Sequence, residues 1–366
     1  MGRKIKFVDL VKENLIVKDK VLKKIGELVD SSKFTLGNAV NRFEKNFASY
    51  CGANYGLGVA SGTDSIRVAL KACDVGKGDE IITTPISYTS TSLAISHAGA
   101  NPVFVDVKDD GNIDPLKIRG AITKKTKALL ITHMYGNPCD LAELKKIAKK
   151  YEIYLIDDCS HAHGANYGGK KVGGICDVSC FSNYPTKCLG AWGDAGTLTT
   201  SSKKIYEKAL LYKNYGEKIR NFSKVIGYNS KLDTIQAIVL NHKLKYLEKW
   251  NRKRQDAAKY YSKGLNNVGD IFVLPFSRDI SYYVFPIKSK FRDKLSKHLS
   301  SNGVENFIHY PMPIHLQECF SFLGYKRGDF PRAEEHSSKV LSIPLYPSIS
   351  RSDQDYVINI IKDFFG

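Results

Sequence analysis

Short apolar runs alternate with segments of helical hydrophobic spacing along the first 150 residues. Four runs have the length and composition of buried strands, at 57–60, 80–83, 103–105 and 128–131. Helical spacing of the apolar positions predicts helices after these runs, at 66–70, 89–98, 115–121 and 141–151. This βαβα order is typical of a mainly parallel sheet flanked by helices, so the pattern predicts an α/β fold.

The same pattern divides the chain into three parts. Residues 1–33 are expected to form an N-terminal helical arm, 34–250 a large α/β domain and 251–366 a smaller C-terminal α/β domain. Two domains fit the length of 366 residues, because single hydrophobic cores stop growing near about 250–300 residues.

The segments after residue 200 complete this outline. Residues 214–228 are polar, aromatic and basic, which favours a long loop. From Leu232 to Tyr261 the apolar positions keep helical spacing, which predicts one long helix leading into the C-terminal domain. In that domain we expect strands at 272–274, 282–287 and 340–343, a helix at 291–302 and a terminal helix.

Residues with reactive or ligand-binding side chains are most frequent between Tyr154 and Gly196. The apolar run Tyr154-Leu155-Ile156 ends in Asp157 and Asp158, and the run 178–181 is followed by Ser182 and Lys187. Because ligands of open α/β sheets bind beyond the carboxyl ends of the strands, a carboxylate and an amine would face one ligand.

Lys187 lies in a loop whose backbone can turn tightly, after Pro185 and before Gly190 and Gly193. This placement suits a lysine that forms a Schiff base with pyridoxal phosphate, and Asp158 could supply the carboxylate that the pyridine nitrogen needs. A surface lysine is the alternative in a chain with 55 basic residues, and spacing alone leaves both open.

The segment 61–65, SGTDS, joins the run 57–60 to a predicted helix. Small and hydroxyl residues at such a junction leave backbone N–H groups free to bind a phosphate at the positive end of the helix. An ordinary helix N-cap is the equal alternative.

Composition narrows the class of protein. The chain is 43% hydrophobic and 25% charged, as ordinary globular proteins are, with a formal net charge of +18. That charge suggests a nucleic-acid partner or an anionic substrate. The lysines lie scattered in pairs on polar helix faces, and no nucleic-acid motif accompanies them, so we expect solvated faces and no nucleic-acid partner.

Neither a membrane segment nor a metal site is expected. The N-terminus lacks the apolar core of a secretory signal, and no uncharged apolar run reaches 18 residues, so we expect a cytoplasmic protein. The eight cysteines show neither C-x-x-C pairs nor zinc spacing, which favours free, mostly buried thiols. Cys188, beside Lys187, is the one thiol expected near the chemistry.

Five segments together resemble one family. They are SGTDS at 61–65, TPISYTST at 84–91, DDCSHAHGA at 157–165, FSNYPTKCLGAWGDAG at 181–196 and GYNSKLDTIQA at 227–237. In this order they are similar to the DegT/DnrJ/EryC1/StrS sugar aminotransferases, which are fold-type I enzymes that use pyridoxal 5′-phosphate. The resemblance implies an aspartate-aminotransferase-like fold, with a mainly parallel sheet and a smaller C-terminal α/β domain.

The resemblance also implies roles for residues around the cofactor. Lys187 would bind the cofactor covalently and move the proton, and Asp158 would pair with the pyridine nitrogen. Tyr88, otherwise a core residue, would stack on the ring, and His161 would lie against the cofactor. His163 is left as structural.

At the phosphate, the resemblance implies contacts from Gly62, Thr63 and Ser182. Asn229 would reach this phosphate from the neighbouring subunit, which implies a homodimer with shared active sites. The sequence departs from its relatives at Lys231, where Arg is usual. Cys188 and Asn183 also replace a common Asn and a common aromatic residue, departures that concern the expected sugar contacts and leave the cofactor contacts unchanged.

The C-terminal half resembles the branch that aminates C3 of dTDP-linked 3-keto-6-deoxyhexoses, in the segments 213–218, 227–233, 309–318 and 324–337. L-Glutamate would donate the amino group through pyridoxamine 5′-phosphate, giving a dTDP-3-amino-3,6-dideoxyhexose. A 4-aminotransferase acting on a dTDP-, UDP- or GDP-4-keto-6-deoxyhexose is the alternative. Candidate sugar contacts are Tyr184, His309, Tyr310 and His315, each of which could equally be an ordinary polar loop residue.

The motif residues also argue against two other functions. Sugar dehydratases that use pyridoxal phosphate carry His in place of the Schiff-base lysine, so Lys187 argues against a dehydratase. A non-catalytic regulatory relative is disfavoured because Asp158, Lys187 and Ser182 are all present.

Overall fold

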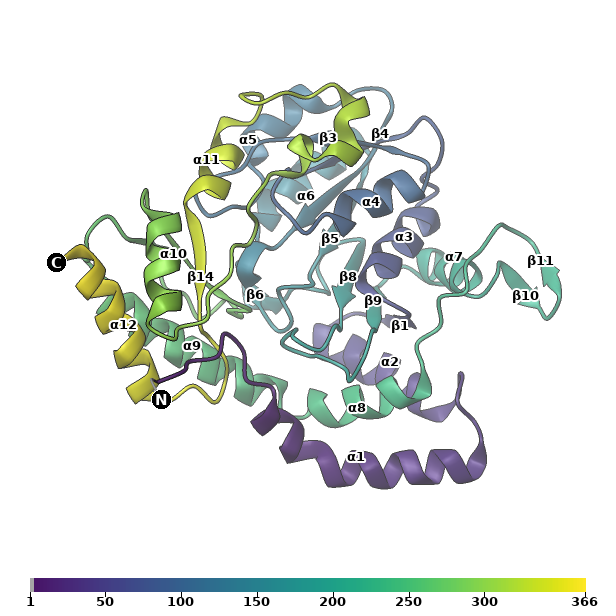
Figure 1. The fold of residues 1–366 in the computed structure, drawn as a ribbon. Helices are drawn as coiled ribbons and strands as arrows, with labels where there is room; N and C mark the ends of the chain where they lie inside the picture. Colours follow the sequence, from purple (N-terminus) through teal and green to yellow (C-terminus); the bar gives the residue numbers. More distant parts are fainter. Residues whose placement is uncertain (1–2) are drawn as a thin grey trace.

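A seven-stranded sheet lies at the centre of the computed structural model, which describes residues 3–366 (Figure 1). In order across the sheet, the strands are β1 (Tyr55–Val59), β9 (Gly196–Thr200), β8 (Val178–Ser182), β5 (Tyr154–Asp158), β4 (Thr126–Thr132), β2 (Glu80–Thr83) and β3 (Asn101–Phe104). β9 runs antiparallel to both neighbours, and the other neighbouring strands are parallel. The predicted α/β fold with a mainly parallel sheet is therefore confirmed.

Helices cover both faces of the sheet, because the strands are apolar on both sides. One core contains residues of α3 (Gly62–Ala72), α4 (Ser90–His97) and α7 (Lys203–Lys213). The other contains residues of α2 (Asn38–Cys51), α5 (Pro115–Ile118), α6 (Leu141–Tyr151) and α8 (Thr234–Leu244). Successive strand residues alternate between the two cores, with Leu130 in the first and Leu129 and Ile131 in the second.

The C-terminal part has a smaller antiparallel sheet of its own. It consists of β12 (Phe272–Val273), β13 (Phe285–Lys288) and β14 (Val340–Ile343), in that order. The helices here are α9 (Leu247–Gly264), α10 (Arg292–Ser301), α11 (Pro331–Lys339) and α12 (Arg351–Phe365), with the short η3 (Ile314–Leu316) and η4 (Glu318–Leu323). A separate core joins this sheet to α9, α10 and α12.

The predicted N-terminal arm forms α1 (Val11–Ser31), and its first two residues lie outside the described part of the chain. Val17 and Val21 pack against Ile238 and Val239 of α8, so the arm lies along the large domain (Figure 1). Other apolar residues of α1, among them Leu15, are exposed to solvent.

Two sequence predictions were wrong in detail. The segment 214–228 is not a plain loop, because β10 (Glu217–Ile219) and β11 (Phe222–Ser223) form a hairpin that projects from the body (Figure 1). Its turn uses Asn221 at a φ of 68°, and the polar composition concealed the strands. The long helix predicted over 232–261 is two helices, α8 and α9. Both keep helical spacing, so the pattern could not reveal the break between them, and α9 crosses the predicted domain boundary at 250.

The structure also bears on membranes and thiols. No helix formed by residues 3–366 is both long enough and apolar enough to cross a membrane. All eight cysteines are free, and all but Cys176 and Cys319 are buried, as predicted.

Candidate active site

A cavity of about 480 Å³ lies at the edge of the sheet where β1, β4, β5 and β8 end. This volume is within the range of small-molecule sites, roughly 300–1,000 Å³. Most predicted site residues line it: Gly62, Thr63, Tyr88, Asp158, His161, Ser182, Tyr184, Lys187, His309 and Tyr310. Segments up to about 250 residues apart in the sequence therefore meet here.

One end of the cavity is formed by the first turn of α3. Ser61 caps this helix by accepting a hydrogen bond from the Asp64 N–H, at 3.1 Å, so the predicted N-cap is present. The N–H groups of Gly62 and Thr63 have no intrahelical acceptor and suit an anion. A Cβ on Gly62 would lie 2.5 Å from the Ser182 Cβ, so only glycine lets α3 approach the end of β8 this closely.

Asp158 is the carboxylate that faces the cavity. It is buried except for one edge, and both of its oxygens accept hydrogen bonds. Oδ1 accepts from the Ser160 N–H, and Oδ2 accepts from the Thr91 hydroxyl, each at 3.0 Å. The carboxylate is therefore held in one orientation by donors.

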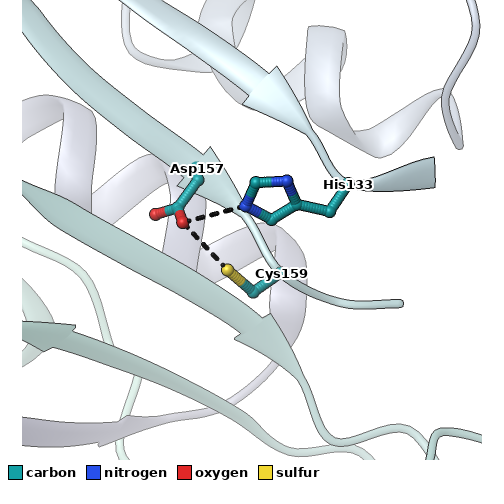
Figure 2. A group of neighbouring side chains, drawn as sticks. All are labelled: His133, Asp157 and Cys159. Atoms are coloured by element: carbon teal, nitrogen blue, oxygen red, sulfur yellow. Dashed lines mark hydrogen bonds and ion pairs between the residues drawn. The ribbon is translucent and has the colours of Figure 1, made fainter. Parts of the chain in front are cut away.

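Asp157 points to the opposite face of β5, where it meets His133 and Cys159 (Figure 2). His133 Nδ1 accepts the Cys139 N–H at 3.0 Å, so its proton is on Nε2, which donates to Asp157 Oδ2 at 3.1 Å. Cys159 Sγ lies 3.1 Å from the same oxygen. Burial, followed by the charge of Asp157, raises the pKa of Cys159 well above its usual value, which keeps the thiol protonated. The three groups form a closed hydrogen-bonded set, and we assign them a structural role.

Lys187 reaches the cavity from the loop after β8. Its Nζ lies 4.2 Å from the ring centroid of Tyr283, and His161 stacks on the same ring at 4.4 Å. Burial and the charge of Lys187 lower the pKa of His161 well below its usual value, so this imidazole is neutral. The Tyr310 hydroxyl lies 3.4 Å from His161 Nε2. The amine thus shares one wall with two aromatic rings and a neutral imidazole.

His309 and Tyr88 form the outer part of the cavity. Burial, and then the charge of Lys187, lower the pKa of His309 to about 4, and its Nδ1 lies 3.0 Å from the Ser342 hydroxyl. Tyr88 is 63% exposed, so the core-packing alternative for this residue is wrong. Its ring lies 6.0 Å from that of Tyr310.

Tyr283 is the main residue that sequence analysis missed. It reaches the cavity because the segment 281–283 pairs with the loop after β4: the Tyr283 N–H donates to the Tyr135 carbonyl at 3.1 Å. Gly136 makes this approach possible, since its φ is +88° and a Cβ there would lie 2.3 Å from the Ser281 hydroxyl. An aromatic residue in a predicted strand has no local signal that separates a site residue from a core residue.

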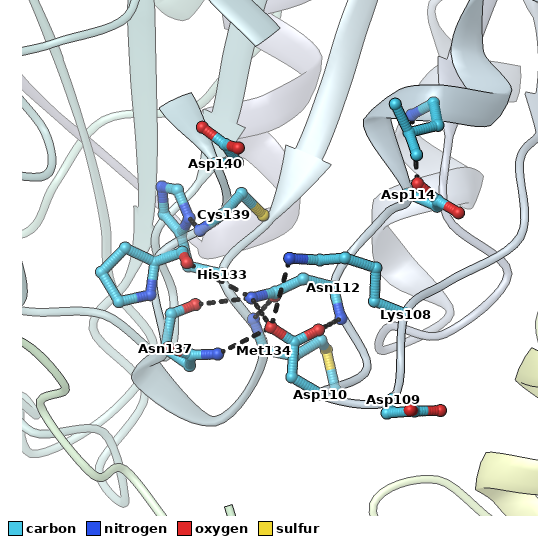
Figure 3. Close-up of polar contacts among 12 residues, drawn as sticks. Lys108, Asp109, Asp110, Asn112, Asp114, His133, Met134, Asn137, Cys139 and Asp140 are labelled. Atoms are coloured by element: carbon cyan, nitrogen blue, oxygen red, sulfur yellow. Dashed lines mark hydrogen bonds and ion pairs between the residues drawn. The ribbon is translucent and has the colours of Figure 1, made fainter. Parts of the chain in front are cut away.

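The loop after β4 is itself fixed by a polar network (Figure 3). The Asn112 side chain accepts the Met134 N–H at 3.0 Å and donates to the Asn137 carbonyl at 3.1 Å. At the tip of this loop, the Tyr135 hydroxyl donates to the His309 carbonyl at 2.6 Å. The network therefore supports the cavity wall from behind.

The structure does not bring three predicted residues to the cavity. His315 is buried elsewhere, 3.2 Å from Glu334 and against Phe330, so its assignment as a sugar contact was wrong. Pro313 and the η3 turn direct it away from Tyr310. Cys188 is buried in the core beneath the Lys187 loop and does not line the cavity, contrary to expectation.

Asn229 lies in a neighbouring depression of about 440 Å³, where it accepts a hydrogen bond from Lys231 Nζ at 2.7 Å. Asp194 lines both this depression and the cavity. The predicted contact of Asn229 with the phosphate of the neighbouring subunit stays a prediction. His163, left as structural, is fully buried between Phe47 and Phe181.

Comparisons with known proteins point to one family. A sequence model of the DegT/DnrJ/EryC1/StrS aminotransferase family matches residues 16–362. The chain is similar, at 38% identity over 98% of its length and 99% of the relative, to the dTDP-3-amino-3,6-dideoxy-α-D-galactopyranose transaminase of Aneurinibacillus thermoaerophilus. It is also 38% identical, over 99% of its length and 98% of the relative, to the "pleiotropic regulatory protein" of Geobacillus stearothermophilus.

A third relative and a solved structure complete the comparison. The UDP-N-acetyl-3-dehydro-α-D-glucosamine 3-aminotransferase of Acidithiobacillus ferrooxidans is 34% identical over 98% of this chain and 97% of that protein. The crystal structure of Streptomyces venezuelae DesV in complex with a ketimine intermediate superposes with a TM-score of 0.96. It is 34% identical and covers 99% of this chain and 98% of DesV.

Proposed function

Because this chain belongs to the DegT/DnrJ/EryC1/StrS aminotransferase family, we propose that it moves the amino group of L-glutamate to C3 of a dTDP-linked 3-keto-6-deoxyhexose. The chain is a nucleotide-sugar aminotransferase, and the amino donor, the nucleotide and the carbon atom are the proposed part. The products would be a dTDP-3-amino-3,6-dideoxyhexose and 2-oxoglutarate. Lys187, Asp158 and the first turn of α3 face one cavity, which supports transamination. The observation that carries the nucleotide and the carbon atom is the 38% identity to a dTDP-3-amino-3,6-dideoxy-α-D-galactopyranose transaminase.

The family's cofactor is pyridoxal 5′-phosphate, and the cavity fits it. Gly62, Thr63 and Ser182 form a cradle that a single Cβ would fill, as a phosphate requires. Asp158 offers a carboxylate to the ring nitrogen, and Lys187 offers an amine to the aldehyde. When bound, this cofactor takes up the amino group and accepts the electron pair of the C–H bond that breaks.

The protein's own groups perform the proton transfer and the positioning. Lys187 Nζ, when neutral, would take the proton from the substrate carbon and deliver it to the cofactor carbon that carried the aldehyde. The Tyr283 ring below Nζ stabilises the ammonium form through a cation–π contact. His161 and His309 are neutral, so they add no competing positive charge. The expected ring contacts are Tyr88 and His161.

The sugar would lie on the outer side, near Tyr184, His309 and Tyr310, which all line the cavity. Tyr184 is 50% exposed and lies after β8, next to the cradle. Its hydroxyl and those of Tyr310 and Tyr88 offer donors and acceptors suited to sugar hydroxyls.

A coupled assay tests the substrate. The protein would be supplied with L-glutamate and, in parallel, dTDP-3-keto, dTDP-4-keto and UDP-4-keto sugars, and the release of 2-oxoglutarate would be followed. We expect the highest kcat/KM with the dTDP-3-keto sugar. Faster turnover of a 4-keto sugar would favour the 4-aminotransferase alternative. The Acidithiobacillus relative acts on a UDP-linked sugar, so a UDP-3-keto sugar belongs in the same series.

A simpler experiment addresses a regulatory function without catalysis, which the name of the Geobacillus relative raises. The purified protein should be yellow, and L-glutamate should bleach it. A coloured protein that glutamate leaves unchanged would support binding without transamination.

A homodimer with shared sites is the second part of the proposal. Among the described residues that line the cavity, Lys187 is the one lysine or arginine, whereas Asp158 and Asp194 are acidic residues. A cofactor phosphate and a sugar diphosphate need further cations. Lys231 and Asn229 lie in the adjacent depression, and exposed apolar residues such as Leu15 and Phe222 suit a subunit interface. We therefore place Asn229 in the site of the partner subunit.

Mixing inactive variants tests this arrangement. Lys187→Ala and a severely impaired Asn229 variant would be combined under conditions of subunit exchange. Random exchange makes half of the dimers mixed, and one of their two sites would carry both native residues. Recovery of about a quarter of wild-type activity is expected.

The control pairs Lys187→Ala with Asp158→Asn. Both of these residues line the same subunit's cavity, so a mixed dimer would hold a fully native site only if the two residues acted in different subunits. In the proposed arrangement each mixed site retains one defect, and no recovery is expected. Recovery in the control, or its absence with Asn229 despite proven exchange, would contradict the assignment.

A further inference from the structure

Three buried hydroxyl groups form a chain that ends on Asp158. Thr132, Ser87 and Thr91 are each at most 3% exposed. The Thr132 and Ser87 hydroxyls lie 3.3 Å apart, those of Ser87 and Thr91 lie 2.8 Å apart, and Thr91 Oγ1 lies 3.0 Å from Asp158 Oδ2. They come from β4, the loop after β2 and the first turn of α4, so the tertiary fold assembles the chain.

The sheet register holds the two ends of this chain together. Thr132 is the last residue of β4, and it pairs with Asp158, the last residue of β5. Side chains of paired residues in neighbouring parallel strands point to the same face. Thr132, Ser87 and Asp158 all line the cavity, while Thr91 lies behind them.

Proton counting fixes the direction of every bond in the chain. A carboxylate only accepts, so the single Thr91 proton must go to Asp158. The Ser87–Thr91 contact then requires the Ser87 proton, and the Thr132–Ser87 contact requires the Thr132 proton. All three dipoles therefore point toward the carboxylate, and each bond polarises the next.

From this geometry we infer that Thr91, supported by Ser87 and Thr132, is a positioning residue that keeps the Asp158 carboxylate aimed at the ring nitrogen of the cofactor. The inference rests on the proposed function, in which Asp158 meets that nitrogen. It adds a specific claim: part of the preference of this site for a pyridine ring comes from a hydroxyl that does not line the cavity.

The experiment compares two ligands that differ at one ring atom. Full-length protein freed of cofactor would be titrated with pyridoxal 5′-phosphate and with 1-deazapyridoxal 5′-phosphate, in which a C–H replaces the ring nitrogen. The dissociation constant of the deaza ligand divided by that of pyridoxal 5′-phosphate measures how much the ring nitrogen contributes to binding. In Thr91→Val, which keeps the shape and removes the hydroxyl, we expect this ratio to fall about 10-fold. Ser87→Ala should lower it by less, about 3-fold.

Two variants serve as controls. Thr91→Ser restores a hydroxyl at the same position and should return the ratio to within about 2-fold of the wild-type value. Ser92→Ala removes the neighbouring buried hydroxyl of α4, which has no hydrogen-bond partner among residues 3–366, and should leave the ratio unchanged.

The outcomes separate this inference from the proposed function. If Thr91→Val weakens both ligands equally, the residue acts on the fold alone, and the inference is overturned while Asp158 keeps its role. If the wild type binds both ligands equally, Asp158 does not meet the ring nitrogen, and both are overturned. If Thr91→Val fails to fold, Ser87→Ala decides the question: a lowered ratio supports the inference, and a ratio equal to that of the wild type overturns it.

Discussion

Asp157 and Asp158 are adjacent at the end of β5, yet they belong to different regions of the molecule. Asp158 faces the cavity, where hydroxyl and backbone donors hold it and one edge remains open to a ligand. Asp157 faces the core, in a closed set with His133 and Cys159. Side chains of a strand alternate between its faces. The same carboxylate chemistry would thus serve the proposed reaction at Asp158 and the stability of the fold at Asp157.

Among changes to the cavity residues, Lys187→Ala should have the largest effect on turnover. Removing the amine removes both the covalent attachment and the group that moves the proton, so turnover should fall by at least about 1,000-fold. Borohydride reduction of the wild type, followed by peptide mapping, should place the pyridoxyl label on Lys187. A label on any other lysine would refute the assignment.

Asp158→Asn is the next largest effect on the cavity side. A neutral amide cannot hold the ring nitrogen protonated, so kcat should decrease by about 100-fold, or about 2.7 kcal/mol of barrier. The protein should still bind the cofactor, but about 10-fold more weakly or worse because the ionic contact to the ring nitrogen is lost. The midpoint of thermal unfolding should change little, as calorimetry can show. Near wild-type turnover would mean that another group serves the ring nitrogen.

Asp157→Asn is the matched variant on the core side and should show the opposite result. The amide oxygen can still accept from His133 and Cys159, but the amide nitrogen would replace Oδ1, which is buried and accepts no hydrogen bond from residues 3–366. The unsatisfied N–H groups should lower the free energy of unfolding by about 2 kcal/mol. Turnover per folded molecule should stay within about 3-fold of wild type. A larger loss of kcat with unchanged stability would erase the distinction between the two carboxylates.

His163 is buried in the core, whereas His161 lines the cavity, so His163 can be tested for its effect on stability alone. Burial lowers the pKa of His163 to about 3, below the unfolded value of about 6.5, so the unfolded chain binds the extra proton. Stability from His163 is therefore complete above pH 6.5 and decreases as the pH falls toward 3. His163→Gln should flatten this decrease by up to about 1.4 kcal/mol per pH unit. Urea unfolding at pH 7.5, 6 and 5 measures it, and an unchanged slope would exclude His163 as a source of acid lability.

Strand ends were the part of the site that could be predicted from the sequence. Asp158 follows a short apolar run, Ser182 ends another, and SGTDS joins a strand to a helix, so each has a local signature. The α/β fold of the large domain could also be predicted, because its strands and helices alternate regularly along the sequence. Local pattern and tertiary structure agree at these positions.

The supporting residues had no such signature. Tyr283 enters the cavity only because Gly136 lets a distant segment approach, and Thr91 matters only through its distance to Asp158. His315 was assigned to the site because the segment 309–318 resembles one branch of the family, but in the fold its side chain is buried beside Glu334. Interactions across the fold cannot be deduced from spacing along the chain.

The connections between the two α/β parts determine how a substrate can enter. A hinge needs a few residues that are free to change φ and ψ. Here α9 passes from one part to the other as an unbroken helix, and Gly136 is packed against the segment 281–283. The walls that carry Lys187 and Tyr283 should therefore move as one rigid body. A nucleotide sugar would enter at the exposed rim beside Tyr88 and Tyr184, and its binding would require no relative movement of the two parts.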